Sequence, residues 1–220
     1  MAPSRQKLID EVRQLAKGWR WGRRMVVPRS AEPYAPPRGP KPYPTDWART
    51  RAGRMAREAL LQLVMRPIAW NETSPEVFGM DNLDALDPPV MFVSNHTSHL
   101  DATLIMITLP HAWREKTAVA AAKDYFFDVW WRSVFTTLVY AGVPIERGAG
   151  ERATQKVREL VSEGWSIVLF PEGTRSTDGW VRRFQHGTAR LAIELQIPVV
   201  PIAIVGAYQA MPKGRNWPIQ

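Results

Sequence analysis

The stretch PPVMFVSNHTSHLDA, residues 88–102, joins an apolar run to a dense polar cluster. The short apolar run at residues 90–94 predicts a buried strand, and residues 99–109 predict the helix that follows it. Asparagine, histidine, serine and aspartate side chains therefore gather where a strand gives way to a helix. Open α/β sheets bind their ligands at the carboxyl ends of strands. The stretch thus predicts an α/β fold with a polar site behind this strand.

The same strand-then-helix pattern recurs along the rest of the chain. Four further apolar runs predict strands: TAVAAA (117–122), GVPIE (142–146), SIVLF (166–170) and VVPIAIV (199–205). Between them, residues 124–139, 150–163 and 186–195 predict helices. Strands that alternate with helices indicate a single α/β sheet domain. A chain of 220 residues is long enough to bury the core of such a domain.

The basic charge of the chain is concentrated at its N-terminus. The net charge is +8, yet residues 1–57 hold 14 Lys and Arg against 4 Asp and Glu, while the remainder is slightly acidic. Seven prolines between residues 28 and 44 predict an extended linker. Basic amphipathic helices are predicted on either side of it, over residues 4–26 and 46–65. This distribution favours an electrostatic tether to an anionic surface, either nucleic acid or lipid.

The helix predicted over residues 46–65 has two interpretations. In the first, its apolar stripe packs against the core and its charged face meets solvent. In the second, the helix lies in a membrane interface, where its arginines meet lipid phosphates. The stripe consists of Ala52, Ala56, Ala59, Leu60, Leu63 and Val64, and the arginines are Arg49, Arg51, Arg54 and Arg57.

Several classes of protein are disfavoured by the composition. The chain holds no cysteine, so neither a disulfide nor a thiol nucleophile is available. No run approaches the roughly 18 to 20 apolar residues of a membrane span. The N-terminus also lacks the apolar core of a signal peptide. We therefore expect a protein that is made and kept in the cytoplasm, where it can still lie on a membrane.

Within the polar cluster at 95–102, His96 and Asp101 are candidates for a base and its orienting partner. Five residues along one continuous helix would leave the two side chains about 140° apart, but a turn after the strand lets His96 fold back. Asp101 would then hold the imidazole tautomer, and the other ring nitrogen would take a proton from a hydroxyl. Two alternatives remain open. In the first, Asp101 and Ser98 form a capping box at the start of the helix. In the second, His96, His99 and Asp101 bind a metal.

A second polar cluster, FPEGTRS (170–176), directly follows the strand predicted at 166–170. Gly173 permits a tight turn, and Thr174 and Arg175 present donors to an anion. The planar guanidinium of Arg175 suits a phosphate because it binds two oxygens at once. An ordinary turn after a strand is the alternative. Arg147, in GVPIERG (142–148), is a weaker candidate for a second phosphate contact.

The segment KDYFFDVWWRSVFTTLVYAG (123–142) is unusually rich in aromatic residues. They fall on every side of the predicted helix, although a globular core needs only one face. This excess indicates an apolar groove or a membrane contact, with core packing as the alternative. The aromatic residues are Tyr125, Phe126, Phe127, Trp130, Trp131 and Phe135.

Together these segments resemble the glycerolipid acyltransferases, the 1-acylglycerol-3-phosphate acyltransferase family. NHTSHLD is similar to the H-x4-D block of that family, GVPIERG to its second block, FPEGTRS to its third and VVPIAIV to its fourth. The four blocks occur in the order of the family and cover residues 90–206. The resemblance implies an α/β fold with a single mixed sheet, preceded by N-terminal amphipathic helices.

The resemblance also implies a reaction, the transfer of a fatty acyl group from acyl-CoA or acyl carrier protein to the hydroxyl of lysophosphatidate. His96 would be the general base and Asp101 its orienting partner. The substrate hydroxyl is itself the nucleophile, so neither a metal nor a cofactor is implied. Glycerol 3-phosphate or another lysolipid remains an alternative acceptor. The implied substrate-binding residues are Arg147, Glu172, Gly173, Thr174, Arg175 and Pro201.

The resemblance also implies how the chain is divided into an extension and a domain. Residues 46–220 are expected to form the acyltransferase domain, with a membrane-facing helical segment at 46–70 and a catalytic core at 90–206. Residues 1–45 are expected to be a basic, proline-rich bacterial extension that adds membrane affinity. We expect peripheral binding to anionic lipid at the cytoplasmic side of the cell membrane, with no nucleic-acid partner. A nucleic-acid-binding protein and a metallohydrolase are the rival classes.

Overall fold

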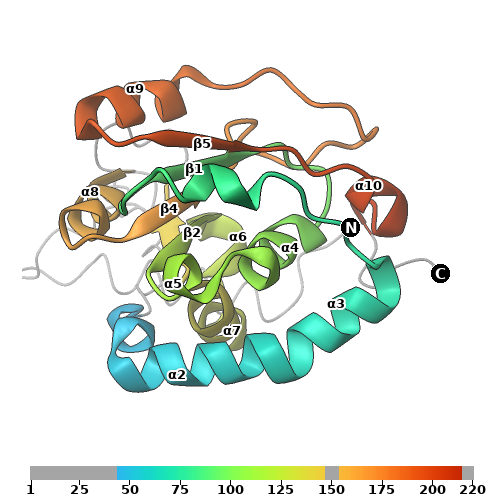
Figure 1. Ribbon diagram of the computed structural model, residues 1–220, viewed down its shortest axis with the longest axis horizontal. Coiled ribbons are helices and arrows are strands. Elements are labelled where there is room, and N and C mark those ends of the chain that lie inside the picture. Colours follow the sequence, from blue (N-terminus) through green and yellow to red (C-terminus); the bar gives the residue numbers. More distant parts are fainter. Residues whose placement is uncertain (1–43, 147–153, 215–220) are drawn as a thin grey trace, which may run out of the picture. The chain divides into compact units, whose positions relative to one another are not determined.

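The computed structural model of the chain describes residues 44–146 and 154–214 (Figure 1). Within them, five strands form one sheet in the spatial order β3-β2-β4-β1-β5. All five predicted strands are found, with ends shifted by three residues at most. They are β1 (Met91–Ser94), β2 (Thr117–Ala122), β3 (Val143–Ile145), β4 (Ser166–Leu169) and β5 (Val199–Ile202).

Every pairing in this sheet is parallel, whereas a mixed sheet was expected. Phe92 of β1, for example, lies in parallel register with Val168 of β4 on one side and Val200 of β5 on the other. A helix stands between each strand and the next along the chain, and such a crossover returns the chain to the starting edge. A parallel sheet covered on both faces also explains why its strands read as nearly continuous apolar runs.

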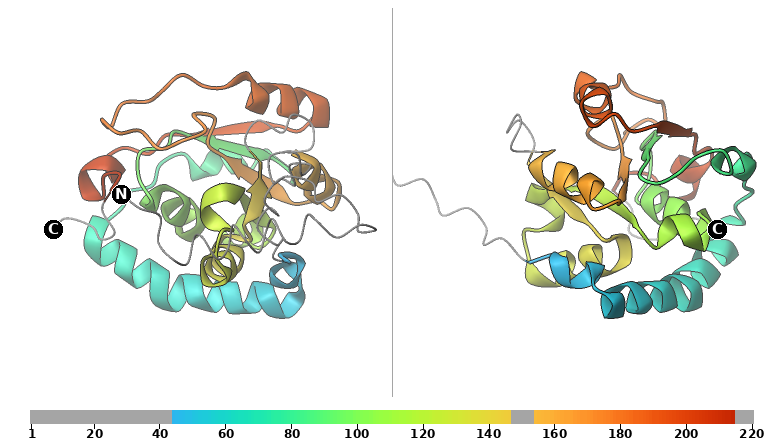
Figure 2. Two further views of the ribbon diagram at one scale, coloured as in Figure 1. Left: turned by 180° about the vertical axis from the view of Figure 1, so that it is seen from behind. Right: turned by 60° about the vertical axis from the view of Figure 1, so that its left-hand side comes forward.

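Helices cover both faces of the sheet (Figures 1 and 2). Phe92 packs in one core cluster with Ile105 of α4 (Leu100–Thr108), whereas the adjacent Met91 packs in the other with Leu160 of α8 (Gln155–Ser162). Successive residues of a strand point to opposite faces, so both layers are anchored by the same short strand. Other helices are α5 (His111–Arg114), α9 (His186–Leu195), α10 (Ala207–Ala210) and the 3₁₀ turns η2 (Asp46–Arg49) and η4 (Met80–Leu83).

The helix predicted at 124–139 is found as two helices, α6 (Lys123–Phe126) and α7 (Trp130–Tyr140). Asp128 Oδ1 accepts a hydrogen bond from the backbone N–H of Val129 at 2.9 Å, and Val129 has an extended backbone. Short acidic side chains compete in this way with the hydrogen bonds of a helix. Arg132 stabilises the break by donating to the carbonyl of Tyr125 at 2.8 Å.

A nearly continuous helical segment runs from Arg51 to Thr73 along the lower edge of Figure 1. It comprises α2 (Arg51–Leu60), a π-helical turn η3 (Leu61–Met65) and α3 (Arg66–Thr73). Pro67 has no N–H to bond to the preceding turn, and the wider π turn lies directly before it. The helix predicted at 46–65 is therefore present and longer. The helix predicted at 4–26 lies outside the described residues, as does nearly all of the basic extension.

Arg57 of α2 is buried, so for this residue the interpretation in which the arginines meet lipid phosphates is wrong. Its side chain is 2% exposed and donates to the carbonyls of Ala48 at 3.3 Å and Glu115 at 3.2 Å. The guanidinium also lies 5.8 Å from the ring centre of Trp165. Burial lowers the pKa of Arg57 to about 10, so the side chain is still charged at neutral pH. It therefore serves as an attachment of α2 to the body of the domain.

Glu58 extends this polar attachment. It binds the guanidinium of Arg114 through both carboxylate oxygens, at 2.6 and 2.9 Å. Arg114 is buried and also donates to the carbonyl of Leu109. The face of α2 that meets the domain is thus held by charged groups with specific partners, and the bidentate geometry fixes the orientation of the helix.

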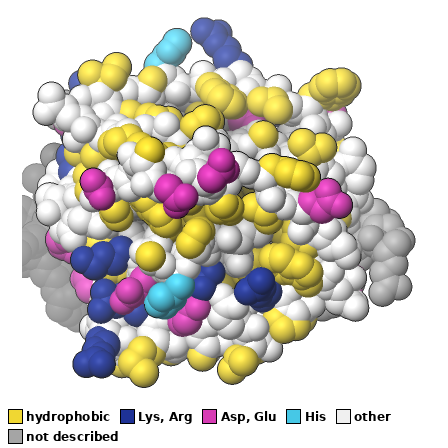
Figure 3. All heavy atoms as spheres, viewed as in Figure 1, with side chains coloured by type: hydrophobic (Ala, Val, Ile, Leu, Met, Phe, Trp, Pro, Cys, Tyr) yellow, Lys and Arg dark blue, Asp and Glu magenta, His cyan; other side chains and the backbone are white. Residues whose placement is uncertain are grey.

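The apolar stripe of α2 and η3 faces outward. Its exposed members are Ala52, Ala56, Ala59, Leu63 and Val64, and Met55 lies beside them at 65% exposure. In Figure 3, apolar side chains are visible along the lower edge, where α2 and α3 run in Figure 1. Core packing therefore does not account for most of the stripe. None of the helices in the described ranges is both long and apolar enough to cross a bilayer.

Replacing Arg57 with alanine is expected to lower the free energy of unfolding by about 2–3 kcal/mol, because two carbonyl oxygens lose a charged donor. Urea denaturation monitored by circular dichroism measures the change. Arg51→Ala is the matched control, since Arg51 is exposed on the same helix and its loss should cost less than about 0.5 kcal/mol. Equal stabilities of the two variants would contradict the attachment role of Arg57.

Candidate active site

Two polar loops meet at the carboxyl ends of neighbouring strands. Residues 95–99 follow β1 and residues 170–176 follow β4, and these two strands pair directly. The backbone of His96 joins the loops in both directions. Its N–H donates to Oε1 of Glu172 at 2.8 Å, and its carbonyl accepts from the N–H of Ser176 at 2.8 Å. The two clusters singled out in the sequence therefore form one site.

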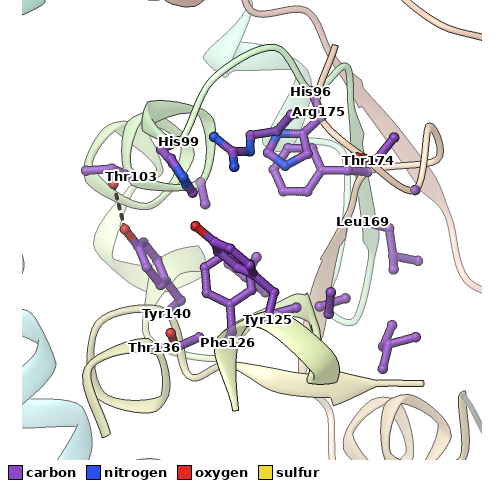
Figure 4. A pocket seen from close by; sticks show the side chains of 18 of the residues that line it. His96, His99, Thr103, Tyr125, Phe126, Thr136, Tyr140, Leu169, Thr174 and Arg175 are labelled. Carbon is purple, nitrogen blue, oxygen red and sulfur yellow. Dashed lines mark hydrogen bonds between the residues drawn. The ribbon is translucent and has the colours of Figure 1, made fainter. Parts of the chain in front are cut away.

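His96 and Asp101 form a close pair within this site. His96 Nδ1 lies 2.8 Å from Oδ2 of Asp101. A carboxylate can only accept, so Nδ1 carries the proton and Nε2 keeps a free lone pair. The imidazole also stacks on Phe170 with a centroid distance of 4.1 Å, which fixes the plane of the ring. Because His96 lines a cavity (Figure 4), the pair has the geometry of a general base with its orienting partner.

Asp101 is fully buried in the first turn of α4. The same Oδ2 that meets His96 also accepts the backbone N–H groups of Thr97 at 2.7 Å and Ser98 at 2.8 Å. The bond to Ser98 matches one half of a capping box, whereas the side chain of Ser98 accepts from the N–H of Leu100 at 3.1 Å and not from that of Asp101. Capping the helix and orienting His96 are therefore compatible, and both draw on the same oxygen. Three donors around one carboxylate stabilise its negative charge despite burial.

The structure gives Glu172 a different task from the expected contact with substrate. Its side chain is buried, and it does not belong to the cavity lining. One carboxylate oxygen accepts the N–H of His96, and the other accepts the N–H of Arg182 at 3.0 Å. Glu172 therefore ties the loop after β4 to the loop after β1 and to the segment before α9. Its bonds are to backbone, which no side-chain spacing in the sequence could have indicated.

Gly173, Thr174 and Arg175 line the cavity, as expected of substrate-binding residues. Gly173 has a φ of +71°, and a Cβ at this position would lie 2.4 Å from Nε2 of Gln185. The positive φ favours glycine at this position, and a larger residue would also displace the side-chain amide of Gln185. The guanidinium of Arg175 reaches toward His99 (Figure 4). Its Nη1 is buried and has no hydrogen-bond partner among the residues that the structure describes.

The two remaining residues expected to bind substrate are Arg147 and Pro201. Arg147 lies outside the described residues. Pro201 lies within β5, where it is aligned with Val93 of β1. Its side chain is exposed and is not part of the cavity lining. A contribution of Pro201 through the shape of β5 is compatible with this position, but direct contact with a ligand in the cavity is not.

His99 and Tyr125 also face the cavity (Figure 4), although the sequence resemblance did not assign them to the substrate site. Their rings stack with a centroid distance of 6.1 Å. Burial lowers the pKa of His99 to about 4, and the nearby charge of Arg175 acts in the same direction. His99 is therefore a neutral imidazole at physiological pH. The aromatic richness of residues 123–142 was a signal for Tyr125, but it could not show which ring would face the reacting groups.

The cavity has a volume of about 1170 Å³. Its polar end holds His96, His99 and Arg175, and most of its remaining wall is apolar. On this wall the hydroxyls of Thr103 and Tyr140 bond to each other at 2.8 Å (Figure 4). The aromatic segment thus supplies a groove, as one interpretation of its composition predicted. Apolar lining residues include Val119, Phe126, Trp131, Phe135 and Leu169.

The metal alternative finds no set of ligands in this site. Nowhere in the described ranges are three or more histidine, aspartate or glutamate side chains grouped so that they could hold a metal ion. His96 engages Asp101 through Nδ1, whereas the ring of His99 packs beside Tyr125. The two histidines therefore do not converge with Asp101 on one point.

The family of the chain follows from comparison with known sequences. The sequence model of the family described as Acyltransferase matches residues 74–205, more than half of the chain. The matched segment contains all five strands and both loops of the site. The chain therefore belongs to the acyltransferase family.

Individual relatives point to one kind of acyltransferase. Proteins named 1-acyl-sn-glycerol-3-phosphate acyltransferase from Chlamydomonas reinhardtii and Brassica napus are 31% and 33% identical to it. These matches cover 64% and 63% of this chain and 41% and 39% of the relatives. The human alpha form is 33% identical, over 55% of this chain and 42% of its own length. The chain thus spans about two fifths of the length of these relatives.

A solved structure shares the fold. The crystal structure of the 1-acyl-sn-glycerophosphate acyltransferase PlsC from Thermotoga maritima superimposes with a TM-score of 0.59 at 26% sequence identity. The superposition covers 78% of this chain and 69% of that protein. The α/β architecture predicted from the sequence is therefore confirmed as that of the glycerolipid acyltransferases.

The burial of His99 predicts a specific dependence of stability on pH. Above pH 6.5 the imidazole is neutral in the folded and the unfolded protein, so it contributes nothing. Between pH 6.5 and 4 the unfolded chain binds a proton that the folded protein does not. Stability is therefore lost as the pH falls through this range. Because His99 is only partly buried, we expect about 1–2 kcal/mol of this loss to disappear in His99→Gln.

Urea denaturation of the wild type and of His99→Gln at about pH 7 and about pH 4.5 measures this difference. His186→Gln is the control, because the side chain of His186 is exposed at the start of α9, and it should retain the wild-type dependence. Identical pH dependences of all three proteins would show that protonation of His99 is not suppressed by the fold.

Proposed function

We propose that the chain transfers a fatty acyl group from a thioester donor, acyl-CoA or acyl carrier protein, to the free hydroxyl of lysophosphatidate. Nε2 of His96 removes the hydroxyl proton while the oxygen attacks the thioester carbonyl carbon. The tetrahedral intermediate then expels the thiolate, which takes the proton back from His96. The products are phosphatidate and the free thiol of the donor. Asp101 stabilises the imidazolium that exists between the two proton transfers.

The contact between His96 and Asp101 carries this proposal. A distance of 2.8 Å to a buried carboxylate fixes the proton on Nδ1 and directs Nε2 into a cavity that also holds Arg175. General-base catalysis of this kind needs no nucleophile from the protein, which accords with a chain that has no cysteine. No cofactor enters the proposed reaction.

The polar end of the cavity supports a phosphorylated acceptor. Arg175 presents a buried Nη1 without a hydrogen-bond partner among the described residues, in the cavity that His96 also lines. Thr174 lines the same end. A guanidinium that approaches an anion with its flat fork binds two phosphate oxygens at once. The proposal retains Arg147 as a further phosphate contact on the strength of the sequence resemblance.

The apolar part of the cavity supports an acyl chain as the group transferred. A volume of about 1170 Å³ lies above the range of about 300–1000 Å³ for small-molecule sites. Long hydrocarbon chains gain roughly 0.8 kcal/mol for each buried methylene group. Such a cavity holds a fatty chain beside the polar end, where the thioester carbonyl would lie within reach of the acceptor hydroxyl.

The proposal also includes peripheral binding to an anionic membrane. We define the apolar face as the exposed residues Met55, Leu63, Val64 and Ile68 of the N-terminal helices with Trp130, Trp131 and Phe135 of α7. α2 and α7 pack against each other, and Ile68, Trp131 and Phe135 also line the cavity. A lipid could thus reach the site without leaving apolar surroundings. The rival nucleic-acid interpretation offers no reason for exposed apolar residues beside the cavity mouth.

His96→Ala is expected to lower kcat by roughly 10²- to 10⁴-fold, because the acceptor hydroxyl loses its base. The assay follows acylation of lysophosphatidate by acyl-CoA and by acyl carrier protein, with glycerol 3-phosphate as a second acceptor. His111→Ala is the control, since His111 is exposed on α5. Full turnover by a folded His96→Ala variant would refute the assignment of the base. A wild type that acylates neither acceptor would refute the proposed function.

Leu63→Asp is expected to reduce binding to vesicles of phosphatidylcholine and phosphatidylglycerol by about tenfold or more, because a charged group replaces a side chain that enters the membrane. Vesicle flotation measures the bound fraction. Leu63 is 75% exposed, and Ile193 of α9, at 78% exposure, is the matched control. Ile193→Asp should bind as the wild type does. An equal loss in both variants, or no loss in Leu63→Asp, would argue against the apolar face as the membrane contact.

A further inference from the structure

Tyr125 has a place in the cavity but no task in the reaction proposed above. It follows β2 on the short helix α6, and β2 pairs with β4 on the side away from β1. In Figure 4 its ring lies at the lower side of the cavity, and its hydroxyl points toward the end that holds His99 and Arg175. The phenol therefore stands opposite the loop that follows β4.

The ring of Tyr125 is held from several sides. Arg132 donates to the Tyr125 carbonyl at 2.8 Å, and its guanidinium lies 5.2 Å from the centre of the Tyr125 ring. Asp128 in turn holds Arg132 through an ion pair at 2.8 Å. Phe126 packs edge-on against the same ring at 4.8 Å, and His99 stacks at 6.1 Å. A side chain restrained in this way loses little entropy when its hydroxyl makes a further contact.

The group that faces the Tyr125 hydroxyl is Arg175. In Figure 4 the hydroxyl points toward the guanidinium, and both side chains line the cavity. Burial lowers the pKa of Arg175, while the neighbouring Tyr125 and the charge of Asp101 act in the opposite direction. A guanidinium can only donate, so the phenolic oxygen is a suitable acceptor for it. Nη1 of Arg175 is buried without a partner among the described residues, so this part of the guanidinium is open to an anion.

We propose that Tyr125 is a positioning residue that orients the guanidinium of Arg175 toward the phosphate of the lipid acceptor. The inference rests on the proposed function in one respect, namely that the acceptor carries a phosphate. Arginine has several rotatable bonds, and an unrestrained fork would lose their freedom on binding the ligand. A neutral phenol removes that freedom without neutralising the charge, as a carboxylate in its place would do. The neutral imidazole of His99 restrains the ring and adds no competing charge.

Direct binding of two lipids tests this inference. Lysophosphatidate and the monoacylglycerol with the same acyl chain are titrated into the full chain in neutral detergent micelles, without an acyl donor. Tyr125→Phe keeps the ring and removes only the hydroxyl. It should weaken binding of lysophosphatidate by roughly 3- to 10-fold, as expected for one hydrogen bond, and leave binding of monoacylglycerol within twofold of wild type, a margin of about 0.4 kcal/mol.

A double-mutant cycle distinguishes action through Arg175 from a general effect on the cavity. In an Arg175→Ala background the hydroxyl has nothing to orient, so adding Tyr125→Phe should change lysophosphatidate affinity by less than about twofold. Tyr208→Phe is the matched control. Its hydroxyl donates to the carbonyl of Thr177 at 2.9 Å, and Tyr208 does not line the cavity. It should bind both lipids as the wild type does.

The possible results separate the inference from the function on which it rests. Selective and non-additive weakening of lysophosphatidate binding supports the positioning role. Equal weakening of both lipids, additive effects with Arg175→Ala, or unchanged affinity in Tyr125→Phe overturns it, as does a wild type that binds both lipids equally. Turnover of the same wild-type preparation is measured separately. Selective binding without acyl transfer would overturn the proposed reaction and leave the orientation of Arg175 by Tyr125 intact.

Discussion

The buried carboxylate of Glu172 is the constraint on which the site depends. Its two oxygens accept the backbone N–H groups of His96 and Arg182, so the loop after β1 is fixed to two parts of the chain that follow β4. Parallel pairing of β1 with β4 brings these segments to the same edge of the sheet, but it does not set their loops. The carboxylate does so by satisfying main-chain donors that burial would otherwise leave unpaired. The position of His96, and through it the direction of Nε2, follows from this junction.

Much of the fold could be predicted from the sequence because the inner strands β1, β2 and β4 are largely buried on both faces and therefore appear as short apolar runs. The meeting of the two polar loops was also predictable, since both follow strands. Strand order was not, because periodicity carries no information about which strands are neighbours. That order decides that Tyr125, after β2, lies opposite Arg175, after β4. The hydrogen bonds from the Glu172 side chain to backbone N–H groups could not be predicted either, because they join residues that meet only in the folded chain.

The helical segment from Arg51 to Thr73 reverses the usual arrangement of a surface helix. An amphipathic helix normally buries its apolar stripe and exposes its charges. Here Arg57 and Glu58 face the domain with dedicated hydrogen-bond partners, while Met55 and Leu63 face outward. The sequence showed the amphipathic pattern but not its direction, because periodicity identifies two faces without saying which one meets the protein. The helix orientation that turns the charged groups toward the domain also exposes the apolar residues. This orientation places the apolar face beside the cavity.

The distance along the chain between His96 and Glu172 has a consequence for the order in which the protein is made. The hydrogen bond between them closes a loop of 76 residues, and β1 has no partner in the sheet until β4 has been synthesised. Non-local contacts of this kind form late, after the entropy of closing a long loop has been overcome. A nascent chain that contains His96 and Asp101 but ends before β4 therefore lacks the junction that positions His96. The reacting groups are assembled only once β4 and the loop after it are present, so shorter nascent chains have no preformed base.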